Sequence, residues 1–166
     1  MLRIEISPLR PGVHHFVLEP GAEELDLDPE RFREVRVKAR LDVHDRRILA
    51  TLDASATVQL ECDRTLQLFD QPIEGRYSIL FAPPEMVAAQ AGDSEGVEVL
   101  HPGDTEIDLT GAVRDTLLLA IPQRKLAPGV EDLDIETVFG EPDAEDEPID
   151  PRWEALRRLR SGDENP

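Results

Sequence analysis

Two neighbouring segments of the chain alternate strictly between apolar and polar residues. VRVKARLDVH at 35–44 and ILATLDASATVQLEC at 48–62 each place their apolar residues at every second position. A period of two with one polar face predicts half-buried antiparallel strands. Asp45 and Arg46 lie between the segments and predict a tight turn, so the two strands form a hairpin. The second strand is long, and we expect a bend or bulge near the small residues 54–56.

The next part of the chain predicts one more strand and a loop. Gln71-Pro72 interrupts the run that follows Cys62, and RYSILFAP at 76–83 alternates again. Residues 83–103 contain several prolines and glycines, which predicts a loop with one helical turn at EMVAAQA.

DLTGAVRDTLLLAIP is the clearest helical pattern in the chain. Asp108 or Thr110 can cap the free amides, and Pro122 ends the pattern, which predicts a helix over 110–121. We expect this helix to cover the sheet. Nearer the N-terminus, LRIEI and HHFVLEP predict one or two short strands, followed by a turn and a short helix around DPERF.

The chain changes character at about residue 141. EPDAEDEPIDP has six acids and three prolines in 11 residues, which predicts a disordered linker. RWEALRRLR follows Asp150-Pro151, a good helix start, and predicts a short basic helix that either docks on its own domain or folds on a partner. We therefore expect one domain at 1–140 and a tail at 141–166.

Composition adds a strong negative charge. The 166 residues include 36 acids and 18 bases, for a formal net charge of −18. Such a surface repels nucleic acid as a whole, because phosphate binding requires basic side chains. Two explanations remain open: a solvated acidic surface, as in a salt-rich cytoplasm, or an acidic face for a basic partner.

Location and redox state follow from what the chain lacks. Its one cysteine cannot form an internal disulfide, and the N-terminus has no long apolar run of the signal-peptide type. No segment approaches the roughly 18 apolar residues that span a membrane. We expect a cytoplasmic protein without a membrane partner.

Cys62 is the first candidate for chemistry, and its position favours a buried structural role. It lies on the apolar face of its predicted strand, and the four histidines occupy separate segments, so neither a nucleophile with its base nor a zinc ligand set is assembled. The chain has no phosphate-binding glycine loop, nucleophile elbow or dinucleotide fingerprint. The sequence therefore predicts no catalytic residue, no metal and no small-molecule cofactor.

A cluster of basic residues is the stronger candidate site. Arg36, Lys38 and Arg40 share the polar face of one strand, and Arg46 and Arg47 follow in the turn. They either form a positive stripe for phosphate or an acidic partner, or belong to a solvated sheet face with cross-strand acids such as Asp53 or Glu61. The few aromatic residues argue against sequence-specific RNA reading.

Three motifs in order resemble the YceD family, also called the large ribosomal RNA subunit accumulation family. They are ECDRTLQ after the long strand, DLTGAVRDTLLLAIP, and the closing DPRWEALRRLR. That family shows Cys-x-Arg-Cys-Leu, a helix ending in Leu-Leu-Leu-Ala-Leu-Pro, and Asp-Pro-Arg before a leucine-rich basic stretch. The matching positions are Cys62, Arg64, Leu66, Asp108, Leu109, Arg114, Asp115, Leu117 to Pro122, Asp150, Pro151, Arg152, Leu156 and Leu159.

The resemblance implies a role in accumulation of large-subunit ribosomal RNA, with no assigned catalytic residue. Many members carry the second cysteine of the first motif and further cysteines after the helix, a set that looks like a metal site. This chain has Thr65 and then QRKLAPGVEDLD in those places. We expect the region to be held by packing instead, through Leu126, Val130 and Leu133.

These observations predict an α+β fold: a curved antiparallel β-sheet, for which a barrel-like form is one option, covered by one main helix, with a flexible acidic C-terminal tail ending in a short helix. The leading hypothesis is a non-enzymatic factor that binds large-subunit precursor RNA or an acidic partner surface. The alternatives are an acidic adaptor or chaperone for a basic ribosomal protein and, with less support, an RNA-processing enzyme. Under the leading hypothesis the binding residues are Arg36, Lys38, Arg40, Arg46, Arg47, Arg152, Arg157, Arg158 and Arg160.

Overall fold

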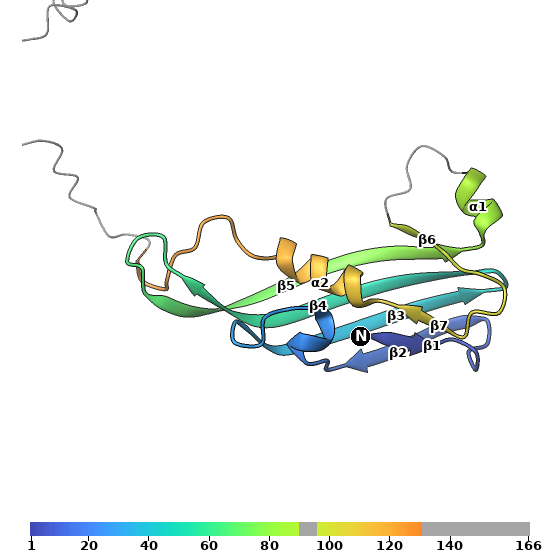
Figure 1. Cartoon of the computed structure of the whole chain (residues 1–166), viewed down its shortest axis with the longest axis horizontal. Helices are drawn as coiled ribbons and strands as arrows, with labels where there is room; N and C mark the ends of the chain where they lie inside the picture. Colours follow the sequence, from blue (N-terminus) through green and yellow to red (C-terminus); the bar gives the residue numbers. More distant parts are fainter. Residues whose placement is uncertain (90–95, 131–166) are drawn as a thin grey trace, which may run out of the picture. The chain divides into compact units, whose positions relative to one another are not determined.

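The computed structural model describes residues 1–89 and 96–130 (Figure 1). The predicted acidic linker, the predicted terminal helix and the predicted boundary at 140/141 lie outside these residues, as does Leu133. The described elements are β1 (Arg3–Glu5), β2 (Gly12–Leu18), the 3-10 helix η1 (Ala22–Leu25), β3 (Phe32–His44), β4 (Arg47–Glu61), β5 (Leu68–Ala82), α1 (Pro84–Ala89), β6 (Val97–Val99), β7 (Glu106–Asp108) and α2 (Thr110–Leu119).

The main sheet has five strands in the order β2-β3-β4-β5-β6. The predicted hairpin is confirmed, because His44 pairs with Arg47 across a two-residue turn. Alternation decides which face is buried. Apolar residues of β3 and β4 turn toward the core, while charged and hydroxyl side chains turn outward.

The predicted irregularity is present, but on the neighbouring strand. Pairing steps from Arg33–Thr57 to Arg36–Ser55, so β3 carries one extra residue there and β4 does not. Glu34 takes a left-handed backbone at φ 54°, which an extra strand residue permits. In β4 the alternation is unbroken from Arg47 to Glu61.

The predicted break at Gln71-Pro72 is wrong, since both residues lie inside β5. The amide of Leu80 donates to the Gly96 carbonyl of the β6 side at 2.7 Å. Backbone amides of a strand point alternately to its two sides, so every second residue counted back from Leu80 faces away from β4. Residue 72 is one of these. Proline lacks that amide and is tolerated at a strand edge, so β5 runs through it.

The sheet is mixed and open, which corrects the expectation of an all-antiparallel or barrel-like sheet. β6 pairs with β5 in parallel, and β2 and β6 form the two edges of the five-stranded sheet. α1 lies in the connection between β5 and β6, and parallel neighbours need such a crossover connection. The predicted helical turn is present there as α1, whereas the predicted helix near DPERF is replaced by η1 a few residues earlier.

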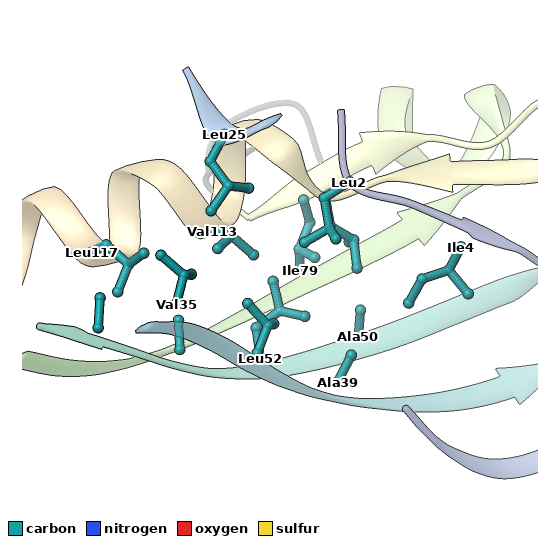
Figure 2. Close-up of a cluster of buried hydrophobic side chains, with 14 of the residues drawn as sticks. Leu2, Ile4, Leu25, Val35, Ala39, Ala50, Leu52, Ile79, Val113 and Leu117 are labelled. Carbon is teal, nitrogen blue, oxygen red and sulfur yellow. The ribbon is translucent and has the colours of Figure 1, made fainter. Parts of the chain in front are cut away.

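A second layer lies over the buried face of the sheet and contributes to one hydrophobic core (Figure 2). β1 and β7 form a separate antiparallel pair and bring Ile4 into the core beside the sheet. The predicted helix is confirmed as α2, whose Val113 and Leu117 are fully buried with Leu52 and Ile79 of the sheet.

Gly75 sets how closely α2 approaches β5. A methyl group placed on Gly75 would come within 2.7 Å of Thr116 Cγ2 and 3.1 Å of the Thr116 carbonyl oxygen. Real carbon atoms do not approach so closely, so the helix rests on the bare backbone of the strand.

Candidate binding surface

Arg36, Lys38 and Arg40 lie on the outer face of the sheet, as their alternation predicts. All three are exposed on β3. Their partners on β4 are Ser55, Asp53 and Thr51 in that order, so the three bases follow one strand with a polar neighbour strand beside them.

Acidic side chains accompany these bases at close range. Arg36 Nη2 lies 2.6 Å from Glu19 Oε1, and Arg40 Nη2 lies 3.6 Å from Asp42 Oδ2. Lys38 has no ion pair with a described residue, but its cross-strand partner Asp53 is paired with an arginine of β5, Arg76. The three bases therefore form part of a face on which both signs alternate, rather than a continuous positive stripe.

Arg46 lies in the turn and Arg47 begins β4, and the two differ in their ion pairs. Arg46 pairs with Glu85 at the start of α1. The backbone amide of Glu85 and this guanidinium hold the pKa of Glu85 below its ordinary value, which is the direction expected for a carboxylate beside donors and a cation. Arg47 is exposed and has no ion pair with a described residue.

A shallow depression of about 440 Å³ on the outer face brings two of the predicted residues together. Arg36, Lys38 and Arg76 line it together with Asp53 and Glu74. Sequence reasoning did not include Arg76, although its alternation in RYSILFAP was a signal that it shares this face. Arg152, Arg157, Arg158 and Arg160 lie outside the described residues.

Cys62 sits in a second candidate site, where the turn after β4 meets the segment after α2. The turn closes through the Leu66 amide, which donates to the Cys62 carbonyl at 2.9 Å. Asp63 binds Lys125 twice: its amide donates to the Lys125 carbonyl at 2.8 Å, and its carboxylate accepts from the Lys125 amide at 2.7 Å.

The Cys62 thiol is fully buried, and its sulfur accepts a hydrogen bond from the Ala127 amide at 3.4 Å. The pKa of Cys62 is lowered to about 7. The largest cause is the hydrogen bond from the Ala127 amide, followed by the Thr65 hydroxyl, whereas burial of the thiol raises the pKa. The Thr65 hydroxyl has no partner within ordinary hydrogen-bond distance, so we assign the lowering chiefly to the backbone amide.

Hydrogen bonds thus hold the region where the resemblance raised the question of a metal. Arg64 Nη1 adds a bond to the Val130 carbonyl at 2.8 Å. In the described part of the chain, no three His, Cys, Asp or Glu side chains are grouped so that they hold a metal ion.

The comparisons with known proteins yield one match. A family model described as large ribosomal RNA subunit accumulation protein YceD matches residues 50–160. No curated protein and no solved structure is similar to the chain. None of the described helices has the length and apolar character needed to cross a membrane.

Proposed function

The chain belongs to the YceD family of large ribosomal RNA subunit accumulation proteins, and we propose that it supports this accumulation by binding a basic partner protein, without catalysis. A ribosomal protein held before assembly is such a partner, and the cytoplasm is the expected place. No small-molecule cofactor takes part.

The choice of a basic partner rests on one observation: most arginines predicted to bind RNA on the sheet and its turn form ion pairs with carboxylates of this chain. Affinity for RNA comes from cations that displace the counterions of phosphates. Arg36, Arg40 and Arg46 already pair with carboxylates, so each would have to break an ion pair before binding phosphate. The whole chain carries a net charge of −18, which attracts a basic protein and repels RNA.

Direct RNA binding is the second candidate. Lys38 and Arg47 are exposed without ion pairs to described residues, and they favour it together with the arginines predicted for the tail. The two candidates differ in what ribonuclease removes and in which charges matter.

The test is capture of partners by the tagged full chain from a lysate, with and without ribonuclease. We expect basic ribosomal proteins to remain after ribonuclease and to dissociate as salt is added, because salt screens exposed charges. Deleting residues 141–166 then shows whether these residues or the rest of the chain hold them.

A charge-reversal pair sharpens this test. The triple variant R36E/K38E/R40E is compared with R10E/R31E/R124E, which changes the charge equally at exposed arginines without ion pairs to described residues. Under the proposal neither variant reduces capture. Loss of captured material on ribonuclease treatment, together with loss in the first variant only, would refute the basic-partner function and establish RNA binding through β3.

A further inference from the structure

Among the residues that the structure describes, no strand pairs with most of the outer edge of β5. β5 spans Leu68–Ala82, but β6 pairs with it only at Leu80–Ala82. Figure 1 shows β6 beside one end of β5 alone. Because pairing with β4 is regular along the whole strand, alternate amides keep pointing to the free side. The backbone amides of Glu74, Arg76 and Ser78 therefore point away from β4, in the stretch between Pro72 and the start of β6.

A groove opens beside this edge, on the buried side of the sheet. It measures about 550 Å³ and lies between α2 and the β5–β6 pair. Tyr77, Gly96, Glu98, Asp115 and Leu119 contribute to its lining. Leu119 is 86% exposed, more than any other large apolar side chain among the described residues.

The groove is acidic as well as apolar. Glu98 pairs in register with Phe81, whose side chain is buried, so Glu98 lies on the α2 side of the sheet. It has no ion pair with a described residue, and partial burial and then the charge of Asp108 raise its pKa. Asp115 adds a second carboxylate and shares Arg114 with Asp26. A carboxylate that is partly desolvated without a cation favours binding of one.

We propose that this edge and groove bind an extended basic segment of a partner protein as an added strand beside β5. The backbone of the segment pairs with the edge at residues 74–76, before Gly96 approaches the Ser78 carbonyl, in the manner of β-augmentation. Alternate side chains enter the groove. A lysine or arginine there packs its aliphatic stem on Leu119 and Tyr77 and places its charge near Glu98.

This site rests on the proposed function, since it specifies how a basic partner is held. It also explains why only part of the edge is free. Pro72 removes one amide from it, because proline has no backbone N–H. The strand is thereby protected from unlimited pairing, and a short open stretch remains.

The first experiment measures binding of a labelled ten-residue peptide, in which arginine alternates with threonine, to the full chain by fluorescence anisotropy. Two further peptides carry N-methyl groups on all arginine amides or on all threonine amides. Only one of these sets faces β5 in an added strand, so we expect one methylated peptide to lose binding by about tenfold or more and the other to keep it. Equal binding by both, or equal loss by both, would overturn strand addition.

The second experiment changes the groove. Leu119→Ser should weaken the peptide about tenfold through lost apolar contact, and Glu98→Gln about fivefold through one lost charge contact. Val17→Ser is the matched control, because Val17 is 64% exposed on β2 at the opposite edge of the sheet. Glu30→Gln is the control for charge, being exposed and without an ion pair to a described residue. Unchanged binding in both groove variants, or equal weakening in the controls, would overturn the groove.

Capture from lysate separates this inference from the function on which it rests. If the double variant L119S/E98Q still retains basic proteins after ribonuclease, the groove is wrong and the proposed function stands. If the unaltered chain retains only ribonuclease-sensitive RNA, the proposed function fails, whatever the peptide shows. If single-stranded RNA displaces the labelled peptide and L119S/E98Q weakens that RNA equally, the groove binds RNA and the inference is overturned.

Discussion

Replacement of Gly75 by alanine tests the contact between α2 and β5 directly. The added methyl group would lie 2.7 Å from Thr116 Cγ2, 3.1 Å from the Thr116 carbonyl oxygen and 3.6 Å from Ala120 Cβ. The first atom can move with its side chain, but the carbonyl belongs to the helix backbone. Relief therefore requires a shift of α2 away from the sheet.

Two opposing effects set the size of the change. Alanine in place of glycine reduces the entropy of the unfolded chain and alone favours the folded state by roughly 0.5–1 kcal/mol. Overpacking of a close contact costs about 1–3 kcal/mol. The overpacking term is larger, so we expect Gly75→Ala to lower the free energy of unfolding by about 1–2 kcal/mol.

The assay is urea denaturation followed by circular dichroism, with Gly111→Ala as the matched control. Gly111 lies in α2 with no atom within 4 Å of its added methyl group, so alanine there should stabilise the protein by roughly 0.5–1 kcal/mol. Thr116→Ser removes the nearer clash and keeps the hydroxyl, which donates to the Ala112 carbonyl at 2.6 Å. It should recover part of the loss in the double variant. A neutral or stabilising Gly75→Ala would refute the close packing of α2 on β5.

Two further predictions concern buried polar groups. Thr110→Val should destabilise the protein by about 1–3 kcal/mol in urea denaturation, because the buried Leu2 amide loses its 2.8 Å hydrogen bond to the Thr110 hydroxyl. The control is Thr57→Val, which removes an exposed hydrogen bond to Glu34 and should change stability by less than about 0.5 kcal/mol. Equal losses in the two variants would contradict the assignment. Cys62 has a folded pKa of about 7 against 9.0 for a free thiol, so its thiolate stabilises the fold fully above pH 9 and this contribution disappears as the pH falls through 7. The stability of the unaltered chain relative to Cys62→Ala should therefore rise between these pH values, and a flat difference would show that the thiol does not ionise in this range.

Strand prediction succeeded where the sequence carries its own period. Residues 35–44 and 48–62 alternate without interruption, and their pairing requires only a two-residue turn. It failed at Pro72, because an edge position cannot be distinguished from an interior one without knowing which strands are neighbours. β6 and β7 have three residues each, too few for a period to be visible.

The candidate surface was less accessible to sequence reasoning than the fold. The alternation placed Arg36, Lys38 and Arg40 on one face, but not the acids beside them. Glu19 reaches Arg36 through the pairing of β2 with β3, and Arg76 reaches Asp53 through the register of β5 on β4. Charge neutralisation is thus a property of strand register. The groove at Leu119 depends on α2 resting on Gly75, which no local pattern reveals.

The pairing of β1 with β7 has a consequence for the order of folding. Ile4 pairs with Ile107, and the Leu109 amide donates to the Leu2 carbonyl, so the first strand is joined to residues synthesised about a hundred positions later. At about 5–20 residues per second, the nascent N-terminus waits on the order of 5–20 s before its partner strand exists. The hairpin of β3 and β4 needs no such delay. The N-terminal strand therefore completes its pairing only after the hairpin can form, and vectorial synthesis leaves Leu2 and Ile4 exposed to other contacts in the interval.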